Sequence, residues 1–201
     1  MKTRLYWVNE IFYSLQGEGA RAGSANVFIR FSGCNLQCRR ATEGFDCDTE
    51  FTSGTSMHQD EIVHAAQALN DRSGLILTGG EPALQVTSDL VRALRGAGFA
   101  PICIETNGTH DVSAMDLDWV SCSPKTAEHT LEVKEAAELR YVRRAGMAIP
   151  RPSIKAKFLY ISPAYSPDGV TREDLAWCIA LVRDNPLWRL SEQQHKRWGV
   201  R

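Results

Sequence analysis

Short runs of apolar, often β-branched residues alternate along this chain with stretches that have helical periodicity. This alternation is typical of parallel strands that are joined by crossover helices. The strands expected from the apolar runs cover residues 27–31, 75–77, 102–104, 119–122, 139–142, 158–161 and 188–190. Helices are expected over 88–96 and from a cap at Thr171 to about Arg183. Another helix is expected to begin at a capping box formed by Ser56 and Gln59.

The length of the chain limits how many strand–helix units it can contain. A complete barrel of eight such units usually takes about 250 residues, whereas this chain has 201. About six units fit, so we predict an α/β fold in the form of a partial (β/α)6-type barrel with shortened helices. The sequence contains no internal repeat, low-complexity tract or obvious linker, which favours a single domain over residues 1–201.

Polar segments rich in glycine, serine and asparagine follow four of the expected strands. These segments are Ser32-Gly33, Thr78-Gly79-Gly80-Glu81-Pro82, Glu105-Thr106-Asn107-Gly108 and Ser123-Pro124-Lys125. The carboxyl ends of parallel strands meet at one rim of the sheet, so we predict a functional site there. The paired glycines would let the backbone approach a ligand closely, although a tight structural turn would favour the same residues.

The six cysteines fall into two groups. Cys103, Cys122 and Cys178 stand singly among apolar residues and are interpreted as core residues. Three others, Cys34, Cys38 and Cys47, lie close together in a polar segment. They could hold zinc with one further ligand, could hold a [4Fe-4S] cluster with one iron left open, or could be clustered by chance. No fourth cysteine or histidine lies near them, and an open iron can take an outside ligand, so the cluster is favoured.

Composition excludes several classes of protein. Hydrophobic residues make up 43% and charged residues 23% of the chain, which are ordinary globular values. The net charge of -1 gives no global attraction to nucleic acid. No apolar run approaches the roughly 20 residues that span a bilayer, and the N-terminus lacks an apolar signal core. We therefore expect a cytoplasmic protein with no nucleic-acid or membrane partner.

The cysteine group together with the Gly-Gly-Glu-Pro strand end resembles the radical S-adenosylmethionine (SAM) superfamily. The segment Glu10-Ile11-Phe12-Tyr13-Ser14-Leu15-Gln16-Gly17-Glu18-Gly19 narrows the resemblance to the 7-carboxy-7-deazaguanine synthase family of queuosine and 7-deazapurine biosynthesis. Further blocks that resemble this family are 31–36, 47–49, 78–82, 105–108, 123–125 and 188–191, the last together with Gln194, His195 and Lys196. The resemblance thus extends over almost the whole chain.

The resemblance implies a lyase that converts 6-carboxy-5,6,7,8-tetrahydropterin to 7-carboxy-7-deazaguanine with loss of ammonia. It implies a [4Fe-4S] cluster, SAM and Mg²⁺ as cofactors, hydrogen abstraction from C6 of the pterin by a deoxyadenosyl radical, and regeneration of SAM. The family also implies a homodimer and an electron donor such as flavodoxin. Two alternatives remain open. One is another radical SAM enzyme, such as a glycyl-radical activase, and the other is a zinc-stabilised binding module.

The resemblance also implies a role for individual residues. Cys34, Cys38 and Cys47 would hold the cluster, and Thr49 would bind Mg²⁺. The cofactor-binding positions are Asp48, Gly80, Glu81, Ser123, Pro124 and Lys125. The substrate-binding positions are Leu15, Gln16, Gly17, Arg30, Thr78, Glu105, His195 and Arg201, of which Thr78 and Glu105 are also the candidate catalytic residues. Arg30 would grip the substrate carboxylate, unless it forms a surface ion pair. The tail 188–201 would cap the substrate, with the terminal carboxylate in contact with it.

The sequence departs from the usual pattern of the superfamily in three places. The cluster loop 34–47 is enlarged, because eight residues separate Cys38 from Cys47. Asp46 stands where an aromatic residue is usual, and residues 162–165 replace a more polar SAM-contacting stretch. The basic segment 140–151 has no counterpart and is expected to form a solvated face.

Overall fold

The structure is a computed structural model that describes residues 4–47, 49–166 and 168–201. The helices are α1 (Arg40–Glu43), α2 (Gln59–Leu69), α3 (Ser88–Gly96), α4 (Arg172–Asp184) and α5 (Gln194–Trp198). Short 3-10 turns cover η1 (Gly19–Arg21), η2 (Pro82–Leu84), η3 (Ser113–Met115) and η4 (Glu128–Thr130). The strands are β1 (Leu5–Leu15), β2 (Ala25–Phe31), β3 (Thr55–His58), β4 (Gly74–Gly79), β5 (Ile102–Thr106), β6 (Trp119–Cys122), β7 (Glu135–Arg143), β8 (Lys155–Pro163), β9 (Tyr165–Ser166), β10 (Gly169–Val170) and β11 (Trp188–Leu190).

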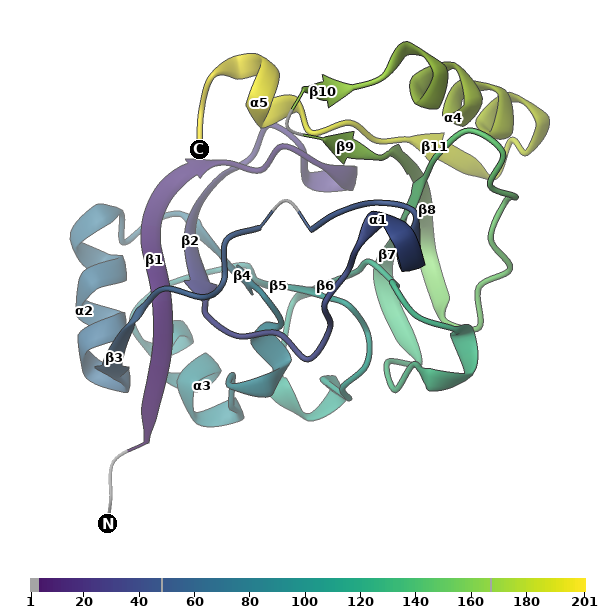
Figure 1. The fold of residues 1–201 in the computed structure, drawn as a ribbon. Coiled ribbons are helices and arrows are strands. Elements are labelled where there is room, and N and C mark those ends of the chain that lie inside the picture. The colour runs from purple at the N-terminus through teal and green to yellow at the C-terminus, as the bar shows by residue number, and fades with distance from the viewer. Residues whose placement is uncertain (1–3, 48, 167) are drawn as a thin grey trace.

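One large sheet organises the molecule. Within the described residues it has nine strands in the order β11-β8-β7-β6-β5-β4-β2-β1-β3. Every neighbouring pair from β2 to β11 is parallel, as the alternating pattern predicts. The sheet curves and stays open, with β3 and β11 at its edges (Figure 1). The predicted partial barrel of α/β type is therefore confirmed.

Two antiparallel strands at one edge of the sheet are absent from the sequence prediction. β1 pairs antiparallel with β2, and β3 pairs antiparallel with the first residues of β1. Ser56 lies in β3 opposite Trp7, so the predicted cap at this residue is wrong. The helix α2 instead begins after His58, whose backbone N–H donates to Glu61 Oε2 at 2.6 Å.

The crossover helices are short, as predicted. The connection from β5 to β6 carries the turn η3, and the connection from β6 to β7 carries the turn η4. Thr171 caps α4 as expected, because its Oγ1 accepts a hydrogen bond from the Asp174 N–H at 3.0 Å. No helix in the described part of the chain is long and apolar enough to cross a membrane.

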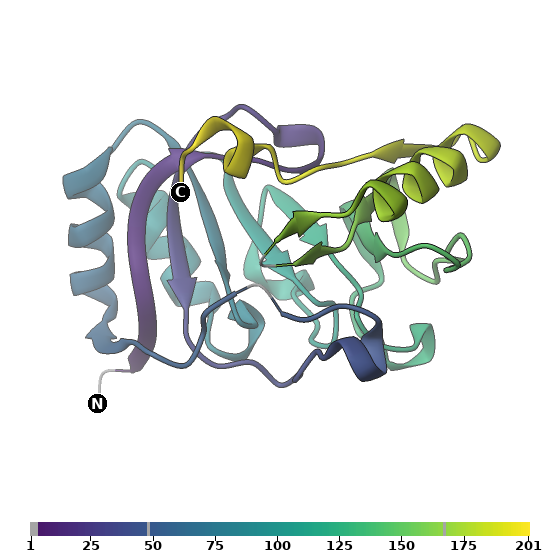
Figure 2. The same ribbon diagram turned by 45° about the horizontal axis from the view of Figure 1, so that its top comes forward.

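Alternate residues of the strands face two different environments, because successive strand side chains point to opposite faces of a sheet. Val27, Ile29 and Phe31 of β2 are fully buried in the main core, which also contains residues of α2 and α3. Figure 2 shows these two helices on the outer side of the curved sheet. On the inner side, Phe12 and Phe28 stack with ring centroids 5.0 Å apart in a small second cluster. Polar residues at the strand ends also lie on this inner side, where they line a cavity.

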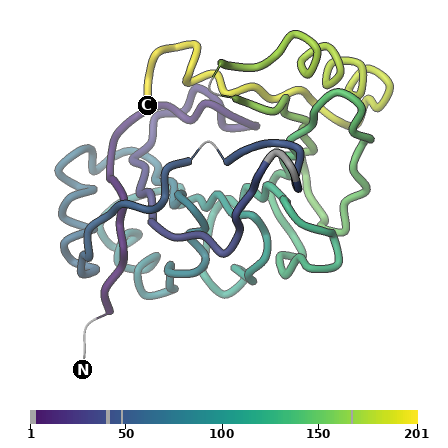
Figure 3. Tube along the Cα trace, in the orientation of Figure 1, coloured from purple at the N-terminus to yellow at the C-terminus, as the bar shows by residue number. Residues whose placement is uncertain are grey.

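The last segment of the chain returns to the first strand. Ser14 in β1 donates a hydrogen bond from Oγ to the main-chain oxygen of Arg201 at 2.7 Å. The Gln194 N–H, at the start of α5, donates to the Gly17 carbonyl oxygen at 3.0 Å. Figure 3 shows the C-terminal end of the chain next to β1, and Figures 1 and 2 agree. The segment 188–201 therefore packs against the end of β1 and the residues that follow it.

Candidate active site

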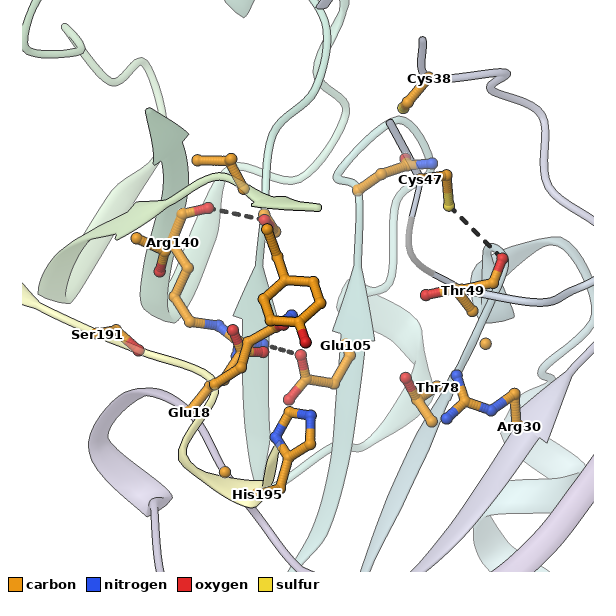
Figure 4. Close-up of a pocket in the computed structure, with 18 of the residues that line it drawn as sticks. Glu18, Arg30, Cys38, Cys47, Thr49, Thr78, Glu105, Arg140, Ser191 and His195 are labelled. Atoms are coloured by element: carbon orange, nitrogen blue, oxygen red, sulfur yellow. Dashed lines mark hydrogen bonds and ion pairs between the residues drawn. The ribbon is translucent and has the colours of Figure 1, made fainter. Parts of the chain in front are cut away.

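A cavity of about 390 Å³ lies on the inner side of the sheet at the carboxyl ends of the parallel strands. Its wall brings together predicted site residues from opposite ends of the sequence (Figure 4). They are Leu15, Gln16, Gly17, Arg30, Cys34, Cys38, Cys47, Thr49, Thr78, Gly80, Glu105, Ser123, Lys125, His195 and Arg201. Asp48 is outside the described residues, and Glu81 and Pro124 are buried behind the wall.

Two glycines allow β4 to pass against the start of the cysteine loop. Gly79 has a φ of 128°, which side-chain-bearing residues rarely adopt. A Cβ on Gly80 would overlap the Gly33 carbonyl oxygen, which accepts a hydrogen bond from the Glu81 N–H at 2.9 Å. The cysteine loop is therefore anchored directly to the strand end, and Gly80 remains accessible on the cavity wall.

The Glu81 side chain lies behind the cavity wall. It is fully buried, and its carboxylate accepts hydrogen bonds from the Asn107 N–H at 2.7 Å and from Thr106 Oγ1 at 2.8 Å. Burial raises the pKa of this carboxyl group. Because these donors lie at the end of β5, Glu81 ties β4 to β5 from behind the wall. Pro124 is also buried and fixes the turn between Ser123 and Lys125.

The three clustered cysteines line one part of the cavity. All six cysteines lie within the described residues and none forms a disulfide. Burial raises the pKa of the Cys34 and Cys38 thiols, and the Lys125 charge partly offsets this for Cys38. Three thiols on one wall fit the three-cysteine ligation of a [4Fe-4S] cluster, whose binding would deprotonate them. Among the described residues, no group of three His, Cys, Asp or Glu side chains is placed to hold a single metal ion.

The other three cysteines lie in the core, as expected. Cys103 is 2% exposed, and Cys122 and Cys178 are fully buried. Burial raises the pKa of Cys103 to about 11 and that of Cys122 and Cys178 to about 12. These thiols are therefore neutral at pH 7, and they do not belong to the group of three clustered cysteines that line the cavity.

The basic segment 140–151 is not a solvated face, so that expectation is wrong. Arg140 is 4% exposed and lines the cavity. Arg144 Nη1 donates to the Gly44 carbonyl oxygen at 3.0 Å, and Lys125 lies over the Phe45 ring at 5.2 Å. Both contacts reach into the enlarged loop 34–47. Arg144, directly after β7, and Lys125, after β6, thus both contact the loop that carries the cysteines.

We expect Arg144→Ala to release iron from the reconstituted protein several times faster than the wild type does. Hydrogen bonds to charged groups contribute about 1.5–3 kcal/mol, and this one holds the loop between Cys38 and Cys47. The measurement is the rate of iron transfer to a chelator, with Arg151→Ala as the control because Arg151 is exposed. Equal rates in the three proteins would show that Arg144 does not support the loop.

Arg30, Thr78 and Glu105 lie in line across three neighbouring strands. Arg30 pairs in register with Thr78, and Leu77 pairs with Ile104, which places Thr78 beside Glu105. Neighbouring strands are spaced by 4.7–4.9 Å, so Arg30 and Glu105 are about 10 Å apart at the backbone. This row offers a cation at one end, a hydroxyl in the middle and a carboxylate at the other end.

Glu10 holds the cationic end of this row. Arg30 Nε donates to Glu10 Oε1 at 2.9 Å, and both side chains are about a quarter exposed. Arg201 pairs with the second oxygen of Glu10, and both guanidinium groups lie over the Phe12 ring. Arg30 is therefore both ion-paired and part of the cavity wall.

The carboxylate end of the row contains residues that the sequence prediction missed. Glu105 accepts a hydrogen bond from Gln16 Nε2 at 2.6 Å and forms an ion pair with Arg140. Arg140 also pairs with Glu18 at 2.8 Å. A charged residue inside the apolar strand Leu139–Val142 was the available signal for Arg140. Ser123 and Lys125 adjoin this group, because Ser123 Oγ donates to the Arg140 carbonyl oxygen at 2.8 Å and accepts from Lys125 Nζ at 2.6 Å.

Comparison with known proteins agrees with this geometry. A model of the "4Fe-4S single cluster domain" family matches residues 15–121, which include all three clustered cysteines. The crystal structure of QueE from Escherichia coli superimposes with a TM-score of 0.72 at 22% identity and covers 95% of each chain, which shows a shared fold.

Two relatives found by sequence share a higher sequence identity with this chain than the Escherichia coli protein does. The 7-carboxy-7-deazaguanine synthase of Bacteroides thetaiotaomicron is 39% identical over 194 residues, which cover 96% of this chain and 98% of the relative. That of Bradyrhizobium diazoefficiens is 40% identical over 214 residues, which cover 98% of this chain and 99% of the relative. Because the similarity extends over both whole lengths, the chain belongs to the 7-carboxy-7-deazaguanine synthase family.

Proposed function

We propose that this protein converts 6-carboxy-5,6,7,8-tetrahydropterin to 7-carboxy-7-deazaguanine and releases ammonia, in queuosine and 7-deazapurine biosynthesis. The reaction would use a [4Fe-4S] cluster, SAM and Mg²⁺. The observation that carries the proposal is that three cysteines without a disulfide line the same cavity as the row of Arg30, Thr78 and Glu105. Family membership supports the same reaction.

The cofactor side of the cavity is built by the cysteine loop and two strand ends. When bound, the cluster and SAM supply one-electron radical chemistry that side chains cannot provide. Cys34, Cys38 and Cys47 would hold the cluster. The exposed backbone at Gly80 permits close approach by SAM, and the ammonium group of Lys125 can bind its carboxylate.

The substrate side of the cavity suits the polarity of a carboxypterin. The pterin carries N–H donors on its aminopyrimidinone edge and a carboxylate at the other end of the bicyclic ring. Glu105 can accept hydrogen bonds from the donor edge, and Arg30 can bind the carboxylate about 10 Å away. Thr78 lies between them, and the stacked rings of Phe12 and Phe28 add apolar surface to the cavity wall.

We expect Thr49→Ala to weaken the dependence of turnover on Mg²⁺. Thr49 lines the cavity beside Cys47, and Mg²⁺ accepts sparse protein ligation because it keeps several waters. Its loss should raise the Mg²⁺ concentration needed for half-maximal rate by about tenfold, and should affect SAM cleavage without substrate less. The control is Thr55→Ala, at an exposed threonine in β3. Unchanged magnesium titrations would remove Thr49 from the ligand set.

The proposed reaction also sets expectations for partners and location. It needs a one-electron donor, for which we propose a flavodoxin, and we propose a homodimer as the functional unit. A cytoplasmic location fits six cysteines without a disulfide, since this compartment keeps thiols reduced. No nucleic-acid or membrane partner is expected. Light scattering after gel filtration tests the dimer, and reduction by flavodoxin tests the donor.

The test of the proposed function is turnover by the reconstituted protein with 6-carboxytetrahydropterin, SAM, dithionite and Mg²⁺. We expect a product with the mass of 7-carboxy-7-deazaguanine and equimolar ammonia. A glycyl-radical activase would cleave SAM and leave the pterin unchanged, and a zinc-stabilised module would do neither. Either of those results, with full iron content, would overturn the proposal.

A further inference from the structure

Arg140 is a buried residue of the cavity wall, and its guanidinium group contacts three carboxylates. It is 4% exposed, and its guanidinium pairs with Glu18 at 2.8 Å, with Glu138 at 3.5 Å and with Glu105. Figure 4 shows its side chain reaching toward Glu105 and Glu18. The planar guanidinium group presents five donors in a fixed fork, so it can serve several carboxylates at once.

Glu138 lies behind this guanidinium, with Oε1 3.5 Å from Arg140 Nε. Glu138 is 1% exposed, and its carboxylate accepts hydrogen bonds from the Ala20 N–H at 2.8 Å and from Ser121 Oγ at 2.9 Å. The backbone of η1 and the strand β6 therefore hold this carboxylate close to one side of the guanidinium. Its other donors project forward to Glu18 and Glu105 at the cavity wall.

The forward contacts close a ring of interactions. Gln16 Nε2 donates to Glu105 Oε1 at 2.6 Å, and the Glu18 N–H donates to Gln16 Oε1 at 3.1 Å. Since Arg140 joins Glu105 to Glu18, the four residues form a closed loop that links the segment after β1 to β5 and β7. Such networks fix both the plane of a carboxylate and the orientation of an amide.

We propose that Arg140 is a positioning residue for substrate recognition, which acts by holding Glu105 and Gln16 in the orientation that accepts the N–H-rich edge of the substrate. This inference rests on the proposed function, because it assigns the edge of the pterin that Glu105 receives. The ring leaves the Glu105 carboxylate on the cavity wall, so its orientation there is set by Arg140 and Gln16 together.

The same group of charges also sets which way the substrate enters. Glu18 and Glu105 both present carboxylate oxygens beside Arg140 at this end of the cavity. This end therefore offers acceptors to the N–H donors of the substrate. The substrate carboxylate is directed to Arg30 at the opposite end of the row.

A double-mutant cycle tests whether Arg140 acts through Glu105. The variants are Arg140→Gln, Glu105→Gln and the two together, each as cluster-loaded protein. We expect Arg140→Gln to raise the KM for 6-carboxytetrahydropterin by roughly 10- to 100-fold, with the KM for SAM and the iron content within about twofold of wild type. The double variant should be no worse than Glu105→Gln, because Arg140 acts on the substrate through the Glu105 carboxylate.

Two further variants keep the test decisive. If Arg140→Gln fails to fold, Arg140→Lys retains the charge but cannot pair with both carboxylates, so an intermediate rise in KM for the pterin is expected. The control Arg183→Gln makes the same change at an exposed arginine in the last turn of α4, away from the cavity wall, and should leave every constant unchanged. Three results would overturn the inference. The first is a rise in the KM for the pterin in the double variant that equals the product of the two single rises, and the second is a rise in the KM for SAM as large as that for the pterin. The third is a wild-type KM for the pterin in Arg140→Lys. Inactivity of the iron-loaded wild type would instead contradict the proposed function.

Discussion

Alanine at Cys34, Cys38 or Cys47 is expected to remove most of the iron from the reconstituted protein and to abolish turnover. The three thiols line one wall of the cavity, and a cluster held by three cysteines loses a full iron ligand with each substitution. Iron content and the absorbance of the reconstituted variants measure the effect. We expect the largest change for this set because the proposed chemistry depends on the cluster.

The buried cysteines supply the matched control for this experiment. Cys178 is fully buried in the core, away from the cavity wall, so Cys178→Ala should keep its iron and lose only some stability. Full iron retention in any one of the three ligand variants would remove that cysteine from the ligand set. Loss of iron in the Cys178 variant as well would mean that the assay reports unfolding.

Gly80→Ala is expected to lower SAM binding and turnover by about 100-fold or more. A Cβ at this position would overlap the Gly33 carbonyl oxygen, a backbone atom that cannot move without shifting the cysteine loop. A displacement of about 1 Å in a reacting group can cost roughly 100-fold in rate. The dissociation constant for SAM and the rate of product formation measure the effect.

Gly96→Ala provides a glycine control for this substitution. Gly96 ends α3, and a Cβ there would meet no other atom within 4 Å. This change should leave SAM binding unaltered and should slightly raise the free energy of unfolding, because alanine restricts the unfolded chain. Normal SAM binding by Gly80→Ala would show that the strand end tolerates a side chain and is not a close-approach site.

Local pattern was sufficient to predict the parallel part of the fold. Strands such as β4 and β5 are short, apolar and buried, and polar glycine-rich segments end them, so their type and order follow from neighbouring residues. The edge strands β1 and β3 depend instead on pairing with each other and with β2. Ser56 illustrates the difference, because its hydroxyl suits a helix cap locally but the residue pairs with Trp7 in the sheet.

The candidate site divides in the same way. Residues directly after strands, such as Thr78 and Glu105, could be predicted because parallel strands bring their carboxyl ends together. Arg140 and Glu18 could not, because their ion pair joins residues 122 positions apart. The Gly-Gly-Glu-Pro motif predicts that Glu81 binds the cofactor. The burial of its side chain and its contacts with the end of β5 could not be predicted, because they depend on the assembled sheet.

The central claim is that this cavity presents C6 of a carboxypterin to the radical chemistry of SAM. The measurement that tests it most directly is turnover of 6-carboxytetrahydropterin that carries deuterium at C6. We predict that 7-carboxy-7-deazaguanine accumulates and that deuterium appears in the SAM recovered from the reaction, since SAM would be regenerated after taking this hydrogen. Product without deuterium in SAM, or no product from protein with full iron and SAM, would contradict the claim.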